Sequence, residues 1–160
     1  MRPALRASAQ SGHSALADVC DHRGVEGGTP SDRVVEQRIR NRIIDYLDLA
    51  ASYEAQVAYQ AAVPFVTVPY EVINQWDDCV PTDPRDVARN VGVFSPDEVR
   101  AMCDFQAVLD GVADAVPNDY PRLADVQALP EWDQLRHAAS SARDVFAVRG
   151  RLSEDHEVID

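Results

Sequence analysis

The fold of this chain is indicated most clearly by residues 95–117, SPDEVRAMCDFQAVLDGVADAVP. Ser95 is a typical N-cap residue, Pro96 fits the first helical position, and Glu98 stands where a capping box places its carboxylate. Apolar residues then recur every three or four positions, which is the period of an amphipathic helix. The pattern predicts a helix over about 96–116. The residues expected on its inner face are Val99, Met102, Cys103, Leu109, Val112, Ala113 and Val116.

The same reasoning predicts a second long helix over about 30–62. Thr29 can cap this helix, Pro30 fits its first position, and Asp32 can complete a capping box. Two adjacent rows of apolar residues follow, so the helix is expected to contact more than one neighbour. Pro64 is expected to end it. The residues expected on its solvent-facing side are Arg38, Asn41, Asp45, Asp48, Ser52 and Gln56.

A third long helix is predicted over about 130–149, before Gly150, which is a typical residue at a helix end. Its inward residues step by three and four along the chain: Trp132, Leu135, Ala139, Ala142 and Phe146. Short helices are predicted near 69–79, 84–90 and 122–128. The sequence shows no alternating pattern of the kind that paired strands require. It therefore predicts an all-α fold, a bundle of three long helices with shorter ones.

The chain is expected to form one domain, because 160 residues of which 46% are hydrophobic can bury a single core. Residues 1–28 show no usable period and are interpreted as a disordered N-terminal extension. Residues 29–150 are interpreted as the helical domain, and residues 151–160 as a loose acidic tail. Apolar residues are nowhere continuous over the roughly 18 positions that a membrane-spanning helix needs.

The net charge of −12 is concentrated in the middle of the chain. Residues 69–133 hold four Arg and fourteen acidic residues, which gives −10. Such a surface repels nucleic acid and anionic lipid and attracts a basic partner. The arginines of residues 33–42 make no basic face, because Arg38 and Arg40 point in different directions and Glu36 can pair with Arg40. A surface that only keeps the protein soluble is the simpler interpretation.

The absence of lysine excludes several reactions, since all fifteen basic residues are arginine. Schiff-base chemistry, a P-loop lysine and a Ser-x-x-Lys nucleophile all need one. Cys20, Cys79 and Cys103 form no C-x-x-C pair, which suits a reducing cytosol. His13, Cys20 and His22 lack the second paired motif of a zinc site.

Motifs for other common chemistries are missing from the sequence as well. A metal site in a helical bundle would use Glu-x-x-His pairs, and the nearest arrangement is Asp133 with His137, expected to be a surface pair. There is no EF-hand spacing, no G-x-S-x-G and no G-x-G-x-x-G. Cys79 and Cys103 fall on apolar faces, where a thiol is inert. The sequence predicts no catalytic residue, no metal site and no cofactor.

Residues 63–79, VPFVTVPYEVINQWDDC, combine aromatic and acidic residues and are the best candidate for a site. On a helix that starts at Pro69, one face carries Val72, Ile73, Trp76 and Cys79. Trp76 is therefore expected to lie in the core rather than to contact a ligand. The other face offers a set of polar residues for binding a partner: Tyr70, Glu71, Asn74, Asp77 and Asp78.

Asp77 and Asp78 oppose the dipole of this short helix, because its last turn is the negative end. The helix over 30–62 has the reverse misplacement, with arginines in its positive half. If the short helix runs back along the long one, Asp77 and Asp78 come within reach of Arg38 and Arg42. Ion pairing between these two groups is therefore a hypothesis that the structure can test.

The function expected from these observations is that of a small, acidic, cytoplasmic helical protein that binds another protein with a basic surface and so inhibits or neutralises it. The alternative is a small-molecule-binding or metal-dependent enzyme that uses the Tyr70–Asp78 region. Neither nucleic acid nor a membrane is expected as a partner. The sequence leaves open whether the wide apolar arc of the first helix is filled within one chain or by a homodimer.

Overall fold

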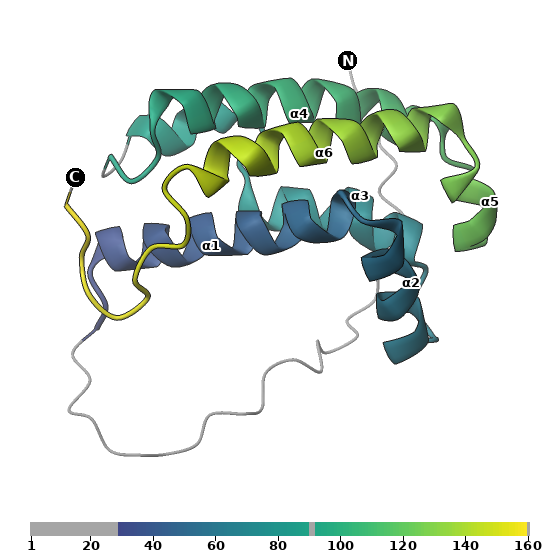
Figure 1. Cartoon of the computed structure of the whole chain (residues 1–160), viewed down its shortest axis with the longest axis horizontal. Helices are drawn as coiled ribbons and strands as arrows, with labels where there is room; N and C mark the ends of the chain where they lie inside the picture. The colour runs from purple at the N-terminus through teal and green to yellow at the C-terminus, as the bar shows by residue number, and fades with distance from the viewer. Residues whose placement is uncertain (1–28, 90–91, 160) are drawn as a thin grey trace.

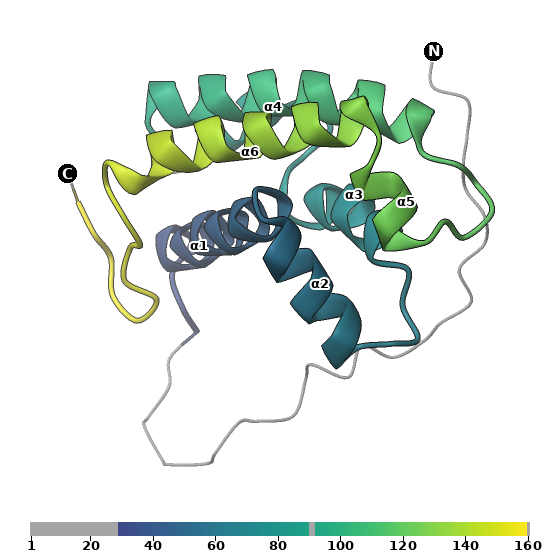
Figure 2. The same ribbon diagram turned by 45° about the vertical axis from the view of Figure 1, so that its right-hand side comes forward.

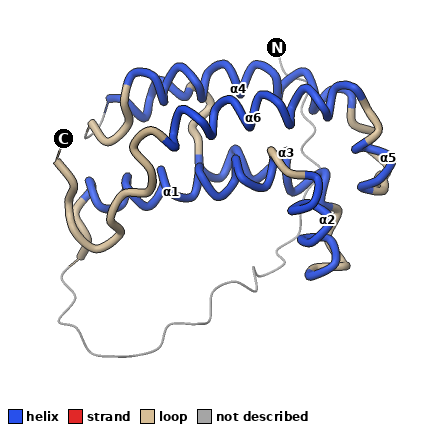
Figure 3. Tube along the Cα trace, in the orientation of Figure 1, coloured by secondary structure: helices blue, strands red, loops and turns tan. Residues whose placement is uncertain are grey.

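The computed structural model describes residues 29–89 and 92–159, and within them the chain is helical with no strands (Figures 1 and 3). The predicted all-α fold class is confirmed. The predicted disorder of residues 1–28 lies outside the described residues. The helices are α1 Asp32–Ala50, α2 Tyr53–Ala62, α3 Val68–Cys79, the 3-10 helix η1 Pro84–Arg89, α4 Pro96–Ala115, α5 Leu123–Gln127 and α6 Pro130–Ala147.

Four helices form the body of the bundle. The helices α4 and α6 lie side by side and run in opposite directions, and α1 packs along α6 (Figures 1 and 2). The helix α3 packs against α1, and η1 packs against α4. The short helices α2 and α5 lie at one end of the molecule, where α2 projects away from the bundle (Figure 2).

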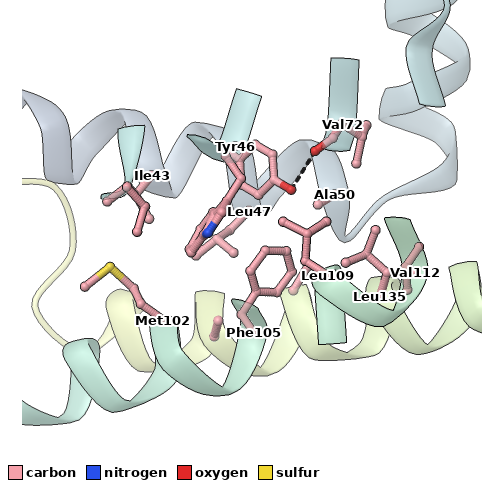
Figure 4. Close-up of a cluster of buried hydrophobic side chains, with 14 of the residues drawn as sticks. Ile43, Tyr46, Leu47, Ala50, Val72, Met102, Phe105, Leu109, Val112 and Leu135 are labelled. Atoms are coloured by element: carbon pink, nitrogen blue, oxygen red, sulfur yellow. Dashed lines mark hydrogen bonds between the residues drawn. The ribbon is translucent and has the colours of Figure 1, made fainter. Parts of the chain in front are cut away.

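Three aromatic side chains fill the centre of the core. Tyr46 of α1, Trp76 of α3 and Phe105 of α4 contact one another, with ring centroids 4.7–5.8 Å apart. Trp76 is fully buried, as predicted, and its indole Nε1 donates a hydrogen bond to Oε1 of Gln106 at 2.9 Å. The Tyr46 hydroxyl donates to the Val72 carbonyl at 2.7 Å (Figure 4). Each polar atom that the aromatic core buries is therefore hydrogen-bonded.

The predicted helix over 30–62 is wrong in its length, because the chain forms two helices there. The helix α1 ends at Ala50 and α2 begins at Tyr53, since the Ser52 hydroxyl accepts a hydrogen bond from the Ala55 amide at 3.1 Å and caps α2. The start of α1 is also corrected: Ser31 rather than Thr29 is the N-cap.

Gln56 holds the two helices at this break. It is fully buried, although the pattern predicted it on the solvent-facing side, and so is Asn41 at 2% exposure. Gln56 Nε2 donates to the carbonyls of Leu49 and Ala50 at the end of α1, where the Leu49 carbonyl also accepts from the Ser52 amide. Its Oε1 accepts from Nε1 of Trp132 and from Nε2 of Gln127, so every hydrogen-bonding group of the Gln56 side chain has a partner.

The predicted loose tail is a further correction. Residues 151–159 form no helix, but side chains of α1 bind their backbone through hydrogen bonds. The spacing of apolar residues along α1 could not predict this contact, because α1 and the tail are far apart in the sequence and come together only in the folded chain. The helix predicted to 149 ends slightly earlier, at Ala147, and Gly150 follows with a φ of +64° and an amide that donates to the Phe146 carbonyl at 3.1 Å.

Replacing Ser52 by alanine tests the break between α1 and α2. The variant S52A is expected to lower the free energy of unfolding by about 1 kcal/mol, because the amide at the start of α2 loses its acceptor. Urea denaturation followed by circular dichroism measures the change. The control is S141A on the exposed face of α6. Its free energy of unfolding is expected to stay within about 0.5 kcal/mol of the wild type, and equal losses in both variants would contradict the capping role.

Candidate functional site

The five predicted partner-binding residues lie on α3, but they differ in exposure. Asn74, Asp77 and Asp78 are exposed, whereas Tyr70 and Glu71 are half-buried. The structure therefore places two of the five where neighbouring parts of the chain already contact them.

Tyr70 is engaged within the fold. Its hydroxyl donates to the Pro117 carbonyl at 2.9 Å and accepts from the Tyr120 amide at 3.1 Å. The two tyrosine rings also meet edge to face, with centroids 5.8 Å apart. Tyr120 has a φ of +56°, a backbone conformation that non-glycine residues adopt at a cost. Tyr70 thus holds the loop between α4 and α5 in place. Glu71 accepts a hydrogen bond from Gln75 on its own helix at 3.2 Å.

The ion pairs expected between α1 and the end of α3 are not formed among the residues that the structure describes. Arg38 donates instead to the Glu154 carbonyl at 2.8 Å. The helix α3 does pack against α1, where Tyr46 contacts Val72 and Trp76. Burial raises the pKa of the Cys79 thiol above its ordinary value, and Arg42 opposes this shift. Asp77 and Asp78 face solvent because the guanidinium groups bind elsewhere or stay exposed.

The pair of charged residues that the fold does bring together is Arg40 and Glu98. Both are almost completely buried, at 0% and 1% side-chain exposure, and Arg40 Nη2 lies 2.6 Å from Glu98 Oε1. Arg40 Nε donates to the same carboxylate at 3.2 Å. This ion pair joins the first half of α1 to the first turn of α4.

Further hydrogen bonds satisfy the rest of both side chains. Arg40 donates to the carbonyls of Phe146 and Gly150 at the end of α6, and its guanidinium lies 5.2 Å from the centroid of the Phe146 ring. Glu98 Oε2 accepts from the Ser95 amide in the predicted capping box and from Arg149 Nη1 at 3.2 Å. A buried pair is tolerated only when its remaining groups are bonded in this way.

The pairing of Arg40 with Glu36 that we expected from the sequence did not take account of a signal for this buried pair. Arg40 precedes Ile43 and Ile44 by three and four positions, so it lies on the apolar face of α1. Glu98 stands in the same relation to Met102. Two opposite charges on the inward faces of two helices indicate a buried ion pair.

The acidic residues of the middle stretch are otherwise on the surface. Of the fourteen in residues 69–133, eight are exposed, five are partly exposed and only Glu98 is buried. Some form local ion pairs, such as Asp83 with Arg85 at 2.8 Å. Others form none among the described residues, and these include Asp77, Asp78, Asp104 and Asp114. The stretch therefore keeps a net negative charge at the surface, since its four arginines are far fewer than its thirteen exposed or partly exposed acidic residues.

The larger surface groove lies between η1 and α4 and has a volume of about 670 Å³. It is open to solvent, and its wall includes Asp83, Arg85, Cys103 and Asp110. Asp83 accepts three hydrogen bonds from Arg85, one from its backbone amide and two from its guanidinium, and is therefore not a free base. Across residues 29–89 and 92–159, no three Asp, Glu, His or Cys side chains converge as metal ligands would. The groove brings together no set of groups with a recognisable reaction.

The second groove, of about 400 Å³, lies at the break between α1 and α2. Arg136 donates to Asp133 at 3.0 Å, which holds the pKa of that carboxyl below its ordinary value. His137 lies 3.3 Å from Asp133, and both are at least half exposed, as predicted for a surface pair. Arg136 also lies 5.4 Å from the ring centroid of Tyr53. These contacts fix side chains on the surface and leave no nucleophile beside a base.

Comparison with protein-family models, with curated proteins and with solved structures found no match for this chain. Within the described residues, no helix has the length and apolar content that crossing a bilayer demands.

Replacing Glu98 by glutamine tests the buried ion pair. The variant E98Q keeps the shape of the side chain but leaves the Arg40 charge buried without a counter-ion. The free energy of unfolding is expected to fall by about 3–5 kcal/mol, as measured by urea denaturation.

The matched control is D97N, one residue earlier on the exposed face of α4. Asp97 pairs with Arg100 at the surface, at 3.1 Å. Its neutralisation is expected to change the free energy of unfolding by less than about 1 kcal/mol. If E98Q and D97N lower the free energy of unfolding by similar amounts, breaking the buried Arg40–Glu98 pair costs no more than breaking a surface pair.

Proposed function

We propose that this protein acts by binding another protein that carries a basic surface, and that it inhibits or neutralises that partner. The binding surface is the exposed carboxylate surface of residues 69–133, with Asp77 and Asp78 at the end of α3 as its centre. The observation that carries the proposal is that this pair is exposed, is without ion-pair partners among the described residues, and lies in the last turn of a helix.

The position of these two aspartates is unfavourable for the fold itself. The end of α3 is the negative pole of the helix dipole, and no basic residue occupies its last turn. Each carboxylate there costs about 0.3–1 kcal/mol. A role outside folding, such as attraction of a basic partner, accounts for acidic residues at positions that folding disfavours.

Electrostatic steering gives the surface a physical use. A field of one sign raises the rate at which an oppositely charged protein arrives, and the effect falls as salt screens the charges. The net charge of −12, and the lack of a basic face among the arginines of residues 33–42, argue against nucleic acid as that partner. Cys79 and Cys103 carry free thiols, which suits the cytoplasmic location that we propose.

An enzyme that uses the Tyr70–Asp78 region has less support. The Tyr70 hydroxyl is occupied by Pro117 and Tyr120, and the Trp76 ring is buried. Asn74, Asp77 and Asp78 are exposed and line neither of the two grooves described above, so they share no enclosed space for a substrate.

A capture experiment with matched charge variants tests the proposal. The wild-type chain is immobilised and exposed to a native lysate at low and at moderate salt. The variant D77N/D78N removes two charges from the proposed centre, and D144N/D155N removes two from exposed positions outside residues 69–133. We expect the wild type and D144N/D155N to retain the same basic protein, and D77N/D78N to retain at least several-fold less of it.

Stability separates this result from misfolding. Neutralising Asp77 and Asp78 is expected to raise the free energy of unfolding, by about 0.3–1 kcal/mol for each residue, so weaker capture cannot come from a damaged fold. Capture that is indifferent to salt and equal for all three chains would contradict the proposal, as would the retention of no basic protein.

A further inference from the structure

The segment 151–159 lies against α1. Side chains of α1 form hydrogen bonds with the backbone of this segment. Asn41 makes a matched pair of hydrogen bonds to one residue: its Nδ2 donates to the Leu152 carbonyl at 2.9 Å, and its Oδ1 accepts from the Leu152 amide at 3.0 Å. This pairing binds the peptide backbone. Asn41 Nδ2 also donates to Oε1 of Glu154 at 3.0 Å, so Asn41 contacts one acidic side chain of the segment as well.

Gln37, one helical turn earlier on α1, also binds the backbone of the segment, but at three different residues. Its Oε1 accepts from the Val158 amide at 2.8 Å, and its Nε2 donates to the carbonyls of Ser153 and His156 at 2.6 and 2.9 Å. Gln37 and Asn41 are 0% and 2% exposed beneath the segment. Two buried amides, spaced four residues apart, thus form a built site for a non-helical peptide.

The segment and the face of α1 beneath it carry opposite charges. Residues 151–160 contain one arginine and four acidic residues, which gives −3. On α1, Arg33 Nε donates to the Val158 carbonyl at 2.7 Å, and Arg38 Nε donates to the Glu154 carbonyl at 2.8 Å. The arginines thereby place positive charge beside an acidic chain, which favours its approach.

The segment contributes little apolar burial of its own. Leu152 and Val158 are only partly buried, and Ile159 is 80% exposed. A segment that is held mainly by hydrogen bonds can open locally without unfolding the core, because each such bond adds little net stability.

We propose that the face of α1 formed by Arg33, Gln37, Arg38 and Asn41 is a binding site for a non-helical acidic peptide, that the chain's own C-terminal segment occupies it, and that an acidic peptide of another molecule binds by displacing this segment. This site is distinct from the carboxylate surface of the proposed function, and its charge is of opposite sign. The two proposals therefore stand or fall separately.

The tethered segment competes strongly with any free peptide. Its local concentration is of the order of millimolar for a short linker. The affinity that a free peptide shows is reduced by the fraction of chains in which the site is open. Weakening the tethered segment, without changing α1, must therefore tighten the binding of the free peptide.

Proline substitutions in the segment provide the test. The variant L152P/V158P removes the two backbone N–H groups that donate to Asn41 and Gln37 and leaves α1 unchanged. The probe is a fluorescein-labelled peptide of residues 151–160, RLSEDHEVID. The control peptide carries proline at the same two positions and has the same charge. Fluorescence anisotropy measures the binding of each peptide to the full-length wild type and to the full-length variant.

We expect the probe to bind L152P/V158P at least tenfold more tightly than it binds the wild type, and the control peptide to bind several-fold more weakly than the probe. Adding N41A to the opened chain is expected to weaken binding of the probe. Circular dichroism checks that the helices are retained. If L152P/V158P loses helix, the single variant V158P, near the chain end, carries the test with an expected gain of roughly fivefold.

Two results would overturn the proposal. One is a folded, opened chain that binds the probe no more tightly than the wild type does. The other is equal binding of the probe and the control peptide. This would show that charge alone attracts both peptides and that the hydrogen bonds from α1 to the peptide backbone do not contribute.

Discussion

The structure depends on the buried ion pair between Arg40 and Glu98. Taking both charges out of water is unfavourable unless every donor and acceptor finds a partner, and here the partners come from three helices. Arg40 reaches the end of α6 through the Phe146 and Gly150 carbonyls, while Glu98 caps the start of α4. This requirement fixes how α1, α4 and α6 meet, which a purely apolar interface would leave less specific.

Other buried polar side chains are likewise hydrogen-bonded, and they too join separate parts of the chain. Gln56 satisfies the carbonyls at the end of α1 and joins α2 to α6, and Gln37 and Asn41 bind the C-terminal segment. Because the interior binds its own polar groups, few of them remain for chemistry. The unpaired charge lies outside, on the carboxylate surface. The two surfaces for which we propose binding roles are the carboxylate surface and the face of α1 beneath residues 151–159.

Much of the fold follows from the sequence, because caps and apolar periods are local signals. The capping box at Ser95, the inner face of α6 and the burial of Trp76 were all predicted. The break at Ser52 was missed, since its apolar rows continue and only the contacts of Gln56 reveal the turn. The contacts of Arg40 with Glu98 and of α1 with the tail join residues distant in sequence, so no local period contains them. For the candidate site, the sequence identified the exposed acids of α3 but not that Tyr70 is occupied within the fold.

A double-mutant cycle on Arg40 and Glu98 tests this account most directly. The free energy of unfolding is measured for the wild type, R40M, E98Q and R40M/E98Q. The account predicts a coupling of about 2 kcal/mol or more, with the double variant no less stable than E98Q alone, because removing Arg40 relieves its uncompensated charge. Additive losses, with no coupling between the two positions, would contradict the claim that this ion pair sets the geometry of the bundle.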